Sequence, residues 1–202
     1  MTGLRLAMLG MTILALVAPP YGVAEEFGGG ETASKPFALT LYGVVLSEDT
    51  MEDVLILNAD FESDFKMAAL ALSRDIDENF DSIDLEWEVQ LAKHVSGQHH
   101  WEVNGLLAGR WLAFPWDTTL DTSVAFGAGL SYATEVPQFE RERHDEANDF
   151  LGYLLVELEL RPPRAEHLSF VVRLHHRSGL FGTFDGVHGA SNALGAGLKY
   201  RF

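Results

Sequence analysis

The chain has 202 residues, of which 47% are hydrophobic and 22% charged, and its formal net charge is -16 at pH 7. This hydrophobic content excludes a disordered chain, and the length fits one domain. The acidity argues against nucleic-acid binding, because a phosphate-binding surface needs clustered lysine and arginine. The lack of cysteine excludes disulfides, thiolate metal sites and cysteine nucleophiles.

The first 24 residues have the pattern of a secretory signal peptide. Arg5 supplies a basic start, Leu6 to Ala18 form an apolar run, and small residues follow at Gly22-Val23-Ala24. The apolar run is too short to cross a membrane comfortably as a helix. The next segment is polar and rich in glycine. The predicted domains are therefore a signal peptide at 1–24, a flexible periplasmic arm at 25–35 and a β-barrel at 36–202.

Over the rest of the chain, side-chain character alternates with a period of two, which is the pattern of strands with one apolar and one polar face. Trp87, Val89 and Leu91 alternate with Glu86 and Glu88 in the clearest segment. Most of these segments are at least ten residues long, which is longer than is usual in soluble sandwiches. The eight predicted strands are 37–46, about 65–74, 83–95, 101–111, 123–132, 150–160, 168–178 and 192–202.

The polar faces of these strands carry charges of both signs. A soluble barrel of lipocalin type turns its charges outward, whereas a small membrane barrel turns its apolar face to lipid and fills its lumen with paired charges. Together with the secretion signal and the aromatic residues at strand ends, this favours an all-β fold, an eight-stranded antiparallel transmembrane β-barrel with a polar, side-chain-filled lumen. The expected lumen charges are Asp84, Glu86, Glu88, Glu102, Glu157, Glu159, Arg110, Arg173, Arg177, Lys199 and Arg201.

The last strand ends at an aromatic residue, Phe202, which resembles the assembly signal of bacterial outer-membrane proteins. We therefore expect a bacterial outer-membrane protein with both barrel ends of the chain in the periplasm. The first outer loop then contains the apolar run Val54 to Leu57, which either extends a strand or lies at the lipid surface. Periplasmic turns are expected at about 76–82, 113–121 and 162–167, and outer loops at about 47–64, 96–100, 135–147 and 179–191.

The seventh predicted strand places two polar residues on its lipid-facing side. If Phe170 and Leu174 face lipid, so do His176 and Ser178, whose Cα atoms are then about 6.5–7 Å apart. A polar pair on a lipid face has a desolvation cost unless it is hydrogen-bonded. Two interpretations remain open at this point. Both residues lie above the hydrocarbon and meet headgroups, or the histidine activates the serine as a nucleophile for acyl transfer.

The neighbouring His175 is expected to point into the lumen and to join its polar network. A metal site formed by His175, His176 and His188 has little support, because the first two face opposite sides of the strand. The sequence therefore predicts neither a metal nor another cofactor.

His176-Arg177-Ser178, near the end of a small outer-membrane barrel, resembles the motif of the PagL-type lipid A deacylases. In that family a His-x-Ser pair on the penultimate strand faces the membrane, and a glutamate on the last strand completes a triad. The resemblance, which in motif terms covers about residues 173–202, implies hydrolysis of an ester-linked acyl chain of lipid A. It assigns Ser178 as the nucleophile, His176 as the base and outer-leaflet lipopolysaccharide as the partner, without a metal.

The chain departs from the family pattern at two positions. Gly179 follows the serine where the family usually has asparagine, and Asn192 stands where the glutamate is expected. Asn192 is able to orient His176, as an amide does in Cys-His-Asn sites. Asp185 and His188 in the intervening loop are the alternative third members.

The alternative function is that of a non-enzymatic barrel, which stabilises the membrane or binds partners through its loops. This hypothesis predicts that His176 and Ser178 can be replaced without consequence, and the missing carboxylate favours it. A solute pore fits poorly, since eight strands leave an interior just filled by side chains. The sequence leaves open which acyl chain is cut and whether the protein is a monomer or a homodimer.

Overall fold

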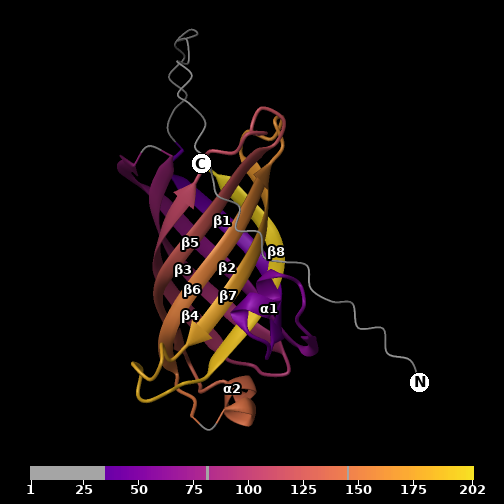
Figure 1. Cartoon of the computed structure of the whole chain (residues 1–202), viewed down its shortest axis with the longest axis vertical. Coiled ribbons are helices and arrows are strands. Elements are labelled where there is room, and N and C mark those ends of the chain that lie inside the picture. Colours follow the sequence, from indigo (N-terminus) through magenta and orange to yellow (C-terminus); the bar gives the residue numbers. More distant parts are fainter. Residues whose placement is uncertain (1–34, 81, 145) are drawn as a thin grey trace, which may run out of the picture. The chain divides into compact units, whose positions relative to one another are not determined.

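The computed structural model describes residues 35–80, 82–144 and 146–202 as an eight-stranded antiparallel barrel (Figure 1). Each strand pairs with its neighbours in sequence, and β8 pairs with β1 to close the barrel. The predicted fold is confirmed, whereas the predicted signal peptide and nearly all of the predicted arm lie outside the described residues. The strands are β1 (Phe37–Ser47), β2 (Phe61–Phe80), β3 (Ile83–Ser96), β4 (Trp101–Trp111), β5 (Asp121–Ala133), β6 (Phe150–Arg161), β7 (Leu168–Ser178) and β8 (Ala190–Arg201).

Two short helices interrupt the loops at one end of the barrel. α1 (Met51–Leu55) lies between β1 and β2, and α2 (Gln138–Arg143) lies between β5 and β6. Within the described part of the chain, neither helix has the length and apolar character needed to cross a membrane. Both helices fall in loops that the sequence predicts to be extracellular, and we refer to this end as the outer end of the barrel.

β2 and β3 form a longer hairpin than the sequence predicts. β2 continues to Phe80 and β3 begins at Ile83, so the predicted turn at 76–82 is wrong in its extent. The ladder continues through a register shift between Ile76 and Asn79. Polar residues interrupt the alternation in this segment, and the prediction therefore ended the strand too early.

The outward face of the barrel is apolar and exposed, as a wall in contact with lipid requires. Leu41, Leu107 and Phe126 project from three different strands and are each at least 63% exposed. A continuous apolar surface of this kind marks a membrane or protein contact. Exposed aromatic residues lie near both ends of the barrel, as in the aromatic girdles of membrane barrels. They include Trp101, Tyr132 and Phe150 at the outer end, and Tyr200 and Phe202 at the opposite end.

The lumen contains the predicted network of buried charges, with Glu157 on β6 at its centre. Its carboxylate lies 2.7 Å from Arg110, 2.5 Å from Arg173 and 2.5 Å from Lys199, and all four side chains are at most 3% exposed. Arg173 also makes two hydrogen bonds of 2.8 Å with Glu88. The attraction between these charges offsets the cost of taking them out of water, and their side chains fill the barrel interior.

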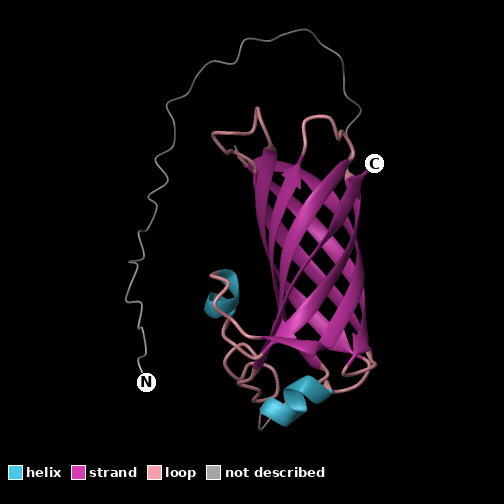
Figure 2. Cartoon of the chain, turned by 90° about the vertical axis from the view of Figure 1, so that its right-hand side faces the viewer, coloured by secondary structure: helices cyan, strands magenta, loops and turns pink. Residues whose placement is uncertain are grey.

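α2 covers the outer end of the lumen (Figure 2). Phe139 is fully buried and packs edge-on against Phe65, with ring centroids 5.0 Å apart. Glu140 is also buried and accepts a hydrogen bond from Arg177 at 2.7 Å. The backbone N–H of Phe139 donates to Gln98 at 3.1 Å. These contacts anchor α2 to both the apolar and the charged parts of the barrel interior.

We expect Phe139→Ala to lower the free energy of unfolding by about 3–5 kcal/mol, because the substitution leaves a cavity where a large buried ring was packed. Urea unfolding of the protein in lipid vesicles, followed by tryptophan fluorescence, measures this change. The matched control is Gln138→Ala, since Gln138 is exposed on the same helix and surface changes usually stay within about 0.5 kcal/mol. Equal effects of the two substitutions would contradict the role of α2 as a cap.

Candidate active site

The polar pair of β7 lies on the outward face, at the outer end of the strand. His176 and Ser178 are each 9% exposed, whereas Phe170 on the same face is 45% exposed. In the strand register, His176 lies opposite Leu154 on β6 and Asn192 on β8. Directly opposed residues have Cβ atoms about 4.5–5.5 Å apart. The pairing of β7 with β8 therefore brings Asn192 to His176.

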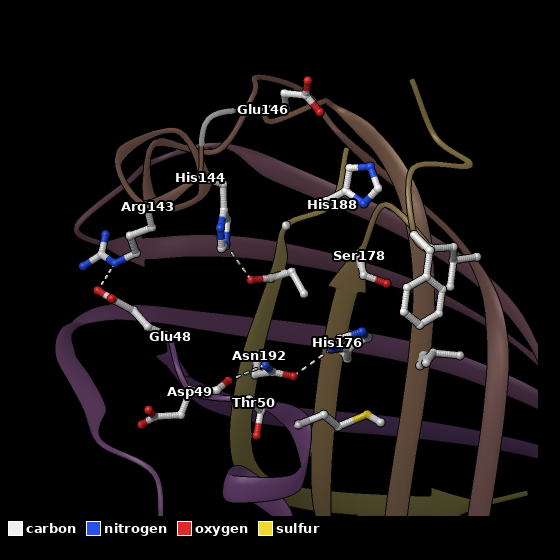
Figure 3. Close-up of a pocket in the computed structure, with 16 residues that line it drawn as sticks. Glu48, Asp49, Thr50, Arg143, His144, Glu146, His176, Ser178, His188 and Asn192 are labelled. Carbon is white, nitrogen blue, oxygen red and sulfur yellow. Dashed lines mark hydrogen bonds and ion pairs between the residues drawn. The ribbon is translucent and has the colours of Figure 1, made fainter. Parts of the chain in front are cut away.

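Hydrogen bonds fix the orientation of the His176 ring. Its Nδ1 lies 2.7 Å from Oδ1 of Asn192, whose Nδ2 donates to the backbone oxygen of Asp49 at 2.7 Å (Figure 3). Because the Asn192 amide group uses Nδ2 to reach a carbonyl, Oδ1 is the atom that faces the histidine. Nδ1 of His176 must then carry the proton in this bond. Nε2 of the neutral ring keeps its lone pair, which is available to accept a serine proton.

Ser178 lies two residues further along β7 and lines the same cavity as His176 (Figure 3). No hydrogen bond joins the two side chains within the described residues, and such bonds are often long in ligand-free sites and tighten when substrate binds. Ala190 on β8 and Gly152 on β6 flank the serine. A Cβ on Gly152 would lie 2.8 Å from the Leu180 side chain, so glycine is needed for Leu180 to pack beside the serine.

These residues line an open cavity of about 930 Å³ where the barrel wall meets the outer loops. One part of its lining is polar and charged. It comes from the three loops that follow β1, β5 and β7 and includes Glu48, Arg143 and His144. Met51 and Leu154 belong to an apolar part of the lining. The cavity is therefore amphipathic.

The outer loops are tied to one another and to β8 around this cavity. Arg143, at the end of α2, forms an ion pair with Glu48, which follows β1. His144 Nε2 lies 2.9 Å from the backbone oxygen of Ala190. Sequence reasoning missed these loop residues and Asp49. Their segments have no periodic pattern, and they approach Asn192 only because the barrel closes.

The structure does not bring Asp185 to the position of a third catalytic residue. Its carboxylate accepts a hydrogen bond from Asn148 at 3.2 Å on the exposed side of the loop, and it does not line the cavity. His188 does line the cavity, and its ring lies against Gly182. Within the described residues, neither side chain makes a hydrogen bond to His176, so Asn192 alone of the three predicted candidates contacts the histidine.

His175 points into the lumen, as predicted. Its Nδ1 lies 3.1 Å from the Tyr153 hydroxyl, and its Nε2 lies 3.1 Å from the Glu102 carboxylate. His176 faces outward and binds Asn192 instead. His175 and His176 thus lie on opposite sides of the barrel wall and cannot bind one metal together, in agreement with the sequence, which gave little support to that site.

A second histidine cluster, which the sequence prediction missed, surrounds Glu102 in the lumen. His94 and His100 approach one carboxylate oxygen at 2.7 and 3.4 Å, and the group of three is compact enough to hold a metal. The side-chain oxygen of Gln98, however, accepts the backbone N–H of Phe139 in α2. The amide nitrogen of Gln98 therefore faces His94 and lies 3.0 Å from its Nδ1, to which it donates. This leaves the proton of neutral His94 on Nε2, where it bonds to Glu102. The arrangement is that of a hydrogen-bonded network rather than of a ready metal site.

Leu174 differs from the prediction, since it is only 2% exposed although it lies on the outward face. α1 contacts β7 and β8 and covers this part of the wall (Figure 1). The period of a strand identifies its face, but it does not reveal a loop that folds back over that face. The same helix accounts for the apolar run Val54 to Leu57, which does not extend a strand. Val54 is fully buried, whereas Leu55, Ile56 and Leu57 are 48%, 65% and 73% exposed.

No family model matches the chain, and no curated protein matches it. Among solved structures, the outer membrane enzyme PagL superposes with a TM-score of 0.57 and 12% identity, over 82% of this chain and 99% of that chain. Neisserial surface protein A (NspA) superposes with a TM-score of 0.51 and 10% identity, over 84% of this chain and 98% of that chain. At these identities the likeness is one of fold. The protein is an eight-stranded β-barrel of the bacterial outer membrane.

Proposed function

We propose that the protein is an outer-membrane acyl-ester hydrolase that removes an acyl chain from lipid A. The observation that carries this proposal is the hydrogen-bonded pair of His176 and Asn192 beside Ser178, on the outward face of the barrel. Polar groups are expensive on a wall that faces lipid, and such residues in membrane proteins are usually functional. The resemblance of the His-x-Ser motif to the PagL-type deacylases and the shared fold of the outer membrane enzyme PagL support the same activity.

The proposed reaction has two halves that use the same base. Ser178 Oγ attacks the acyl carbonyl while His176 Nε2 takes the hydroxyl proton. The tetrahedral intermediate collapses, the sugar oxygen leaves with that proton, and the acyl group stays on the serine. Water then attacks the acyl-serine as His176 takes its proton, and the fatty acid and free serine are released.

The loop that follows the serine supplies candidate donors for the oxyanion. The N–H of Gly179 is bonded to the Gly189 oxygen at 3.2 Å. The N–H groups of Leu180 and Phe181 have no acceptor among the described residues, and both residues have left-handed backbones, with φ of 46° and 57°. Consecutive N–H groups of this kind form anion-binding concavities in turns. They are the groups we expect to stabilise the intermediate.

The second candidate function is that of a non-enzymatic surface barrel. It is favoured by the amide at position 192, because Asn192 orients the His176 ring but carries no charge to stabilise an imidazolium. The fold likeness to NspA, a surface protein, also agrees with it. In this alternative the residues around the cavity contribute only to the packing of the outer loops.

Mass spectrometry of lipid A distinguishes the two functions. Lipid A is extracted from cells that produce the wild-type chain or Ser178→Ala, after both proteins are shown to be folded in the outer membrane. Loss of one acyl chain with the wild type alone supports the hydrolase. Identical lipid A from both strains contradicts deacylation and leaves the non-enzymatic barrel.

We expect Asn192→Ala to lower kcat about a hundredfold, because the His176 ring loses the partner that fixes its tautomer. Asn192→Asp should stay within about tenfold of the wild type, since a carboxylate oxygen also accepts the Nδ1 proton. The rate of fatty-acid release from lipid A in mixed micelles gives both values. If Asn192 had only a structural role, aspartate at this position would not restore kcat relative to alanine. Equal losses in the two variants would therefore contradict the positioning role of Asn192.

A further inference from the structure

α1 lies outside the barrel, against its lipid-facing wall. Figure 2 shows this helix beside the strands and set back from their outer ends, whereas α2 lies beyond the strand ends. α1 contacts β7 and β8, the two strands that carry His176 and Asn192. The helix is therefore placed at the depth of lipid-facing side chains.

The apolar side chains of α1 and of the residues after it divide into two sets. Val54 is fully buried, and Met51 lines the cavity of Ser178. The three consecutive residues Leu55 to Leu57 instead point away from the protein and are 48–73% exposed. Exposure of three adjacent apolar side chains to water is unfavourable, whereas their insertion into the outer leaflet is favourable.

A second segment of the cavity lining is also apolar. Phe181 is 97% exposed and Leu180 is 38% exposed, and both line the cavity. Both also adopt left-handed backbones, which bulky residues rarely do. Strained backbone and a fully exposed phenylalanine at one point of a loop are unfavourable unless the side chain has an apolar environment.

We propose that the apolar side chains of Met51 and Leu55 to Leu57 form one lip and the Leu180–Phe181 pair a second, and that the two lips insert into the outer leaflet and hold one acyl chain of the lipid substrate beside Ser178. This inference rests on the proposed function and adds the subsite for the chain that is removed. Leu55 to Leu57 anchor the first lip in lipid, while Met51 and Leu154 line the path to the serine.

The position of the cavity identifies the occupant as a lipid acyl chain. The outward faces of β7 and β8 run from the cavity along the lipid-facing wall, where Phe170 and Leu198 are 45% and 52% exposed. Lipid chains surround this wall, so a chain needs no transfer through water to reach the site. The charged side chains of the outer loops lie on the headgroup side. An ester bond at the boundary between headgroup and chains would thus meet Ser178.

Insertion of the first lip can be measured without activity, because the chain has no cysteine and accepts a single label. Ile56→Cys carries an environment-sensitive NBD fluorophore in vesicles of phosphatidylethanolamine and phosphatidylglycerol. We expect blue-shifted emission and quenching by lipid-bound nitroxides, as for the wall control Leu198→Cys. The loop control Asp185→Cys should report water. Emission at position 56 that matches position 185 would overturn the insertion.

The acyl-chain role is tested by the double variant Ile56→Ala/Leu57→Ala. We expect its rate on lipid A in vesicles to fall about tenfold, because a lip without these anchors no longer holds Met51 against a chain in the leaflet. Its rate on p-nitrophenyl acetate should equal that of the wild type, since the serine and histidine are untouched. The matched control is Leu107→Ala/Leu130→Ala, which removes exposed apolar side chains from β4 and β5.

Full activity of the Ile56→Ala/Leu57→Ala variant on lipid A, or an equal loss in the wall control, would show that the lip holds no chain. The proposed function fails by a different result, in which Ser178→Ala leaves the hydrolysis of both esters unchanged. In that case the fluorescence measurement still decides whether α1 enters the leaflet. A failure of the lip and a failure of the hydrolase are thus distinguishable.

Discussion

Ser178→Ala is expected to lower kcat for lipid A at least about 10³-fold, because the substitution removes the attacking oxygen of the proposed reaction. The change deletes one atom from a side chain that is 9% exposed and that lies between Ala190 and Gly152. We therefore expect the barrel to fold normally. The measurement is fatty-acid release by the purified protein in mixed micelles, with the heat-dependent gel shift of folded barrels as the test of folding.

The matched control for this prediction is Ser169→Ala on the same strand. Ser169 faces the lumen, is 1% exposed and has no hydrogen-bond partner for its hydroxyl within the described residues. Its replacement should leave the rate unchanged. A Ser178→Ala protein as active as this control would show that Ser178 is not the nucleophile.

Glu157→Leu is expected to lower the free energy of unfolding by about 3–5 kcal/mol, since removal of one member of a buried ion network leaves the others uncompensated. Three buried cations contact this carboxylate, namely Arg110, Arg173 and Lys199. Without it, these cations retain only the remaining lumen carboxylates for compensation. Equilibrium unfolding by urea in lipid vesicles measures the loss.

An exposed ion pair provides the comparison for Glu157. Asp121 pairs with Arg161 at a barrel end, where both side chains are more than one third exposed. Asp121→Asn should change the free energy of unfolding by only about 0–1 kcal/mol, because water screens such pairs. If the two substitutions destabilised the barrel equally, burial would not be the source of the effect.

The barrel could be predicted because its determinants are local and repeated. Alternation along each strand identifies two faces, and charges such as Glu157 and Arg173 on the inner face distinguish a membrane barrel from a soluble one. The same reasoning missed the extension of β2 to Phe80, where polar residues interrupt the alternation but backbone pairing continues. Backbone hydrogen bonds do not depend on side-chain pattern, so strand ends were the weakest part of the prediction.

The candidate site was predictable only where it lies on strands. The faces of His176, Ser178 and Asn192 follow from alternation, and the structure places the first and third in contact. The sequence could not show that Asp49 holds the Asn192 amide or that α1 covers Leu174. Loop conformations have no period, and these contacts join segments that are distant in the sequence.

The contact between Asn192 and Asp49 spans the seam at which the first and last strands meet. Asn192 lies opposite Ser47 across this seam, and Phe37 and Phe202 close its other end with two backbone hydrogen bonds. Before β1 and β8 pair, the chain has the serine and the histidine, but no Asp49 carbonyl to turn the amide toward the ring. The proposed hydrolase is thus complete only in the closed barrel, because its base is oriented from across the closing seam.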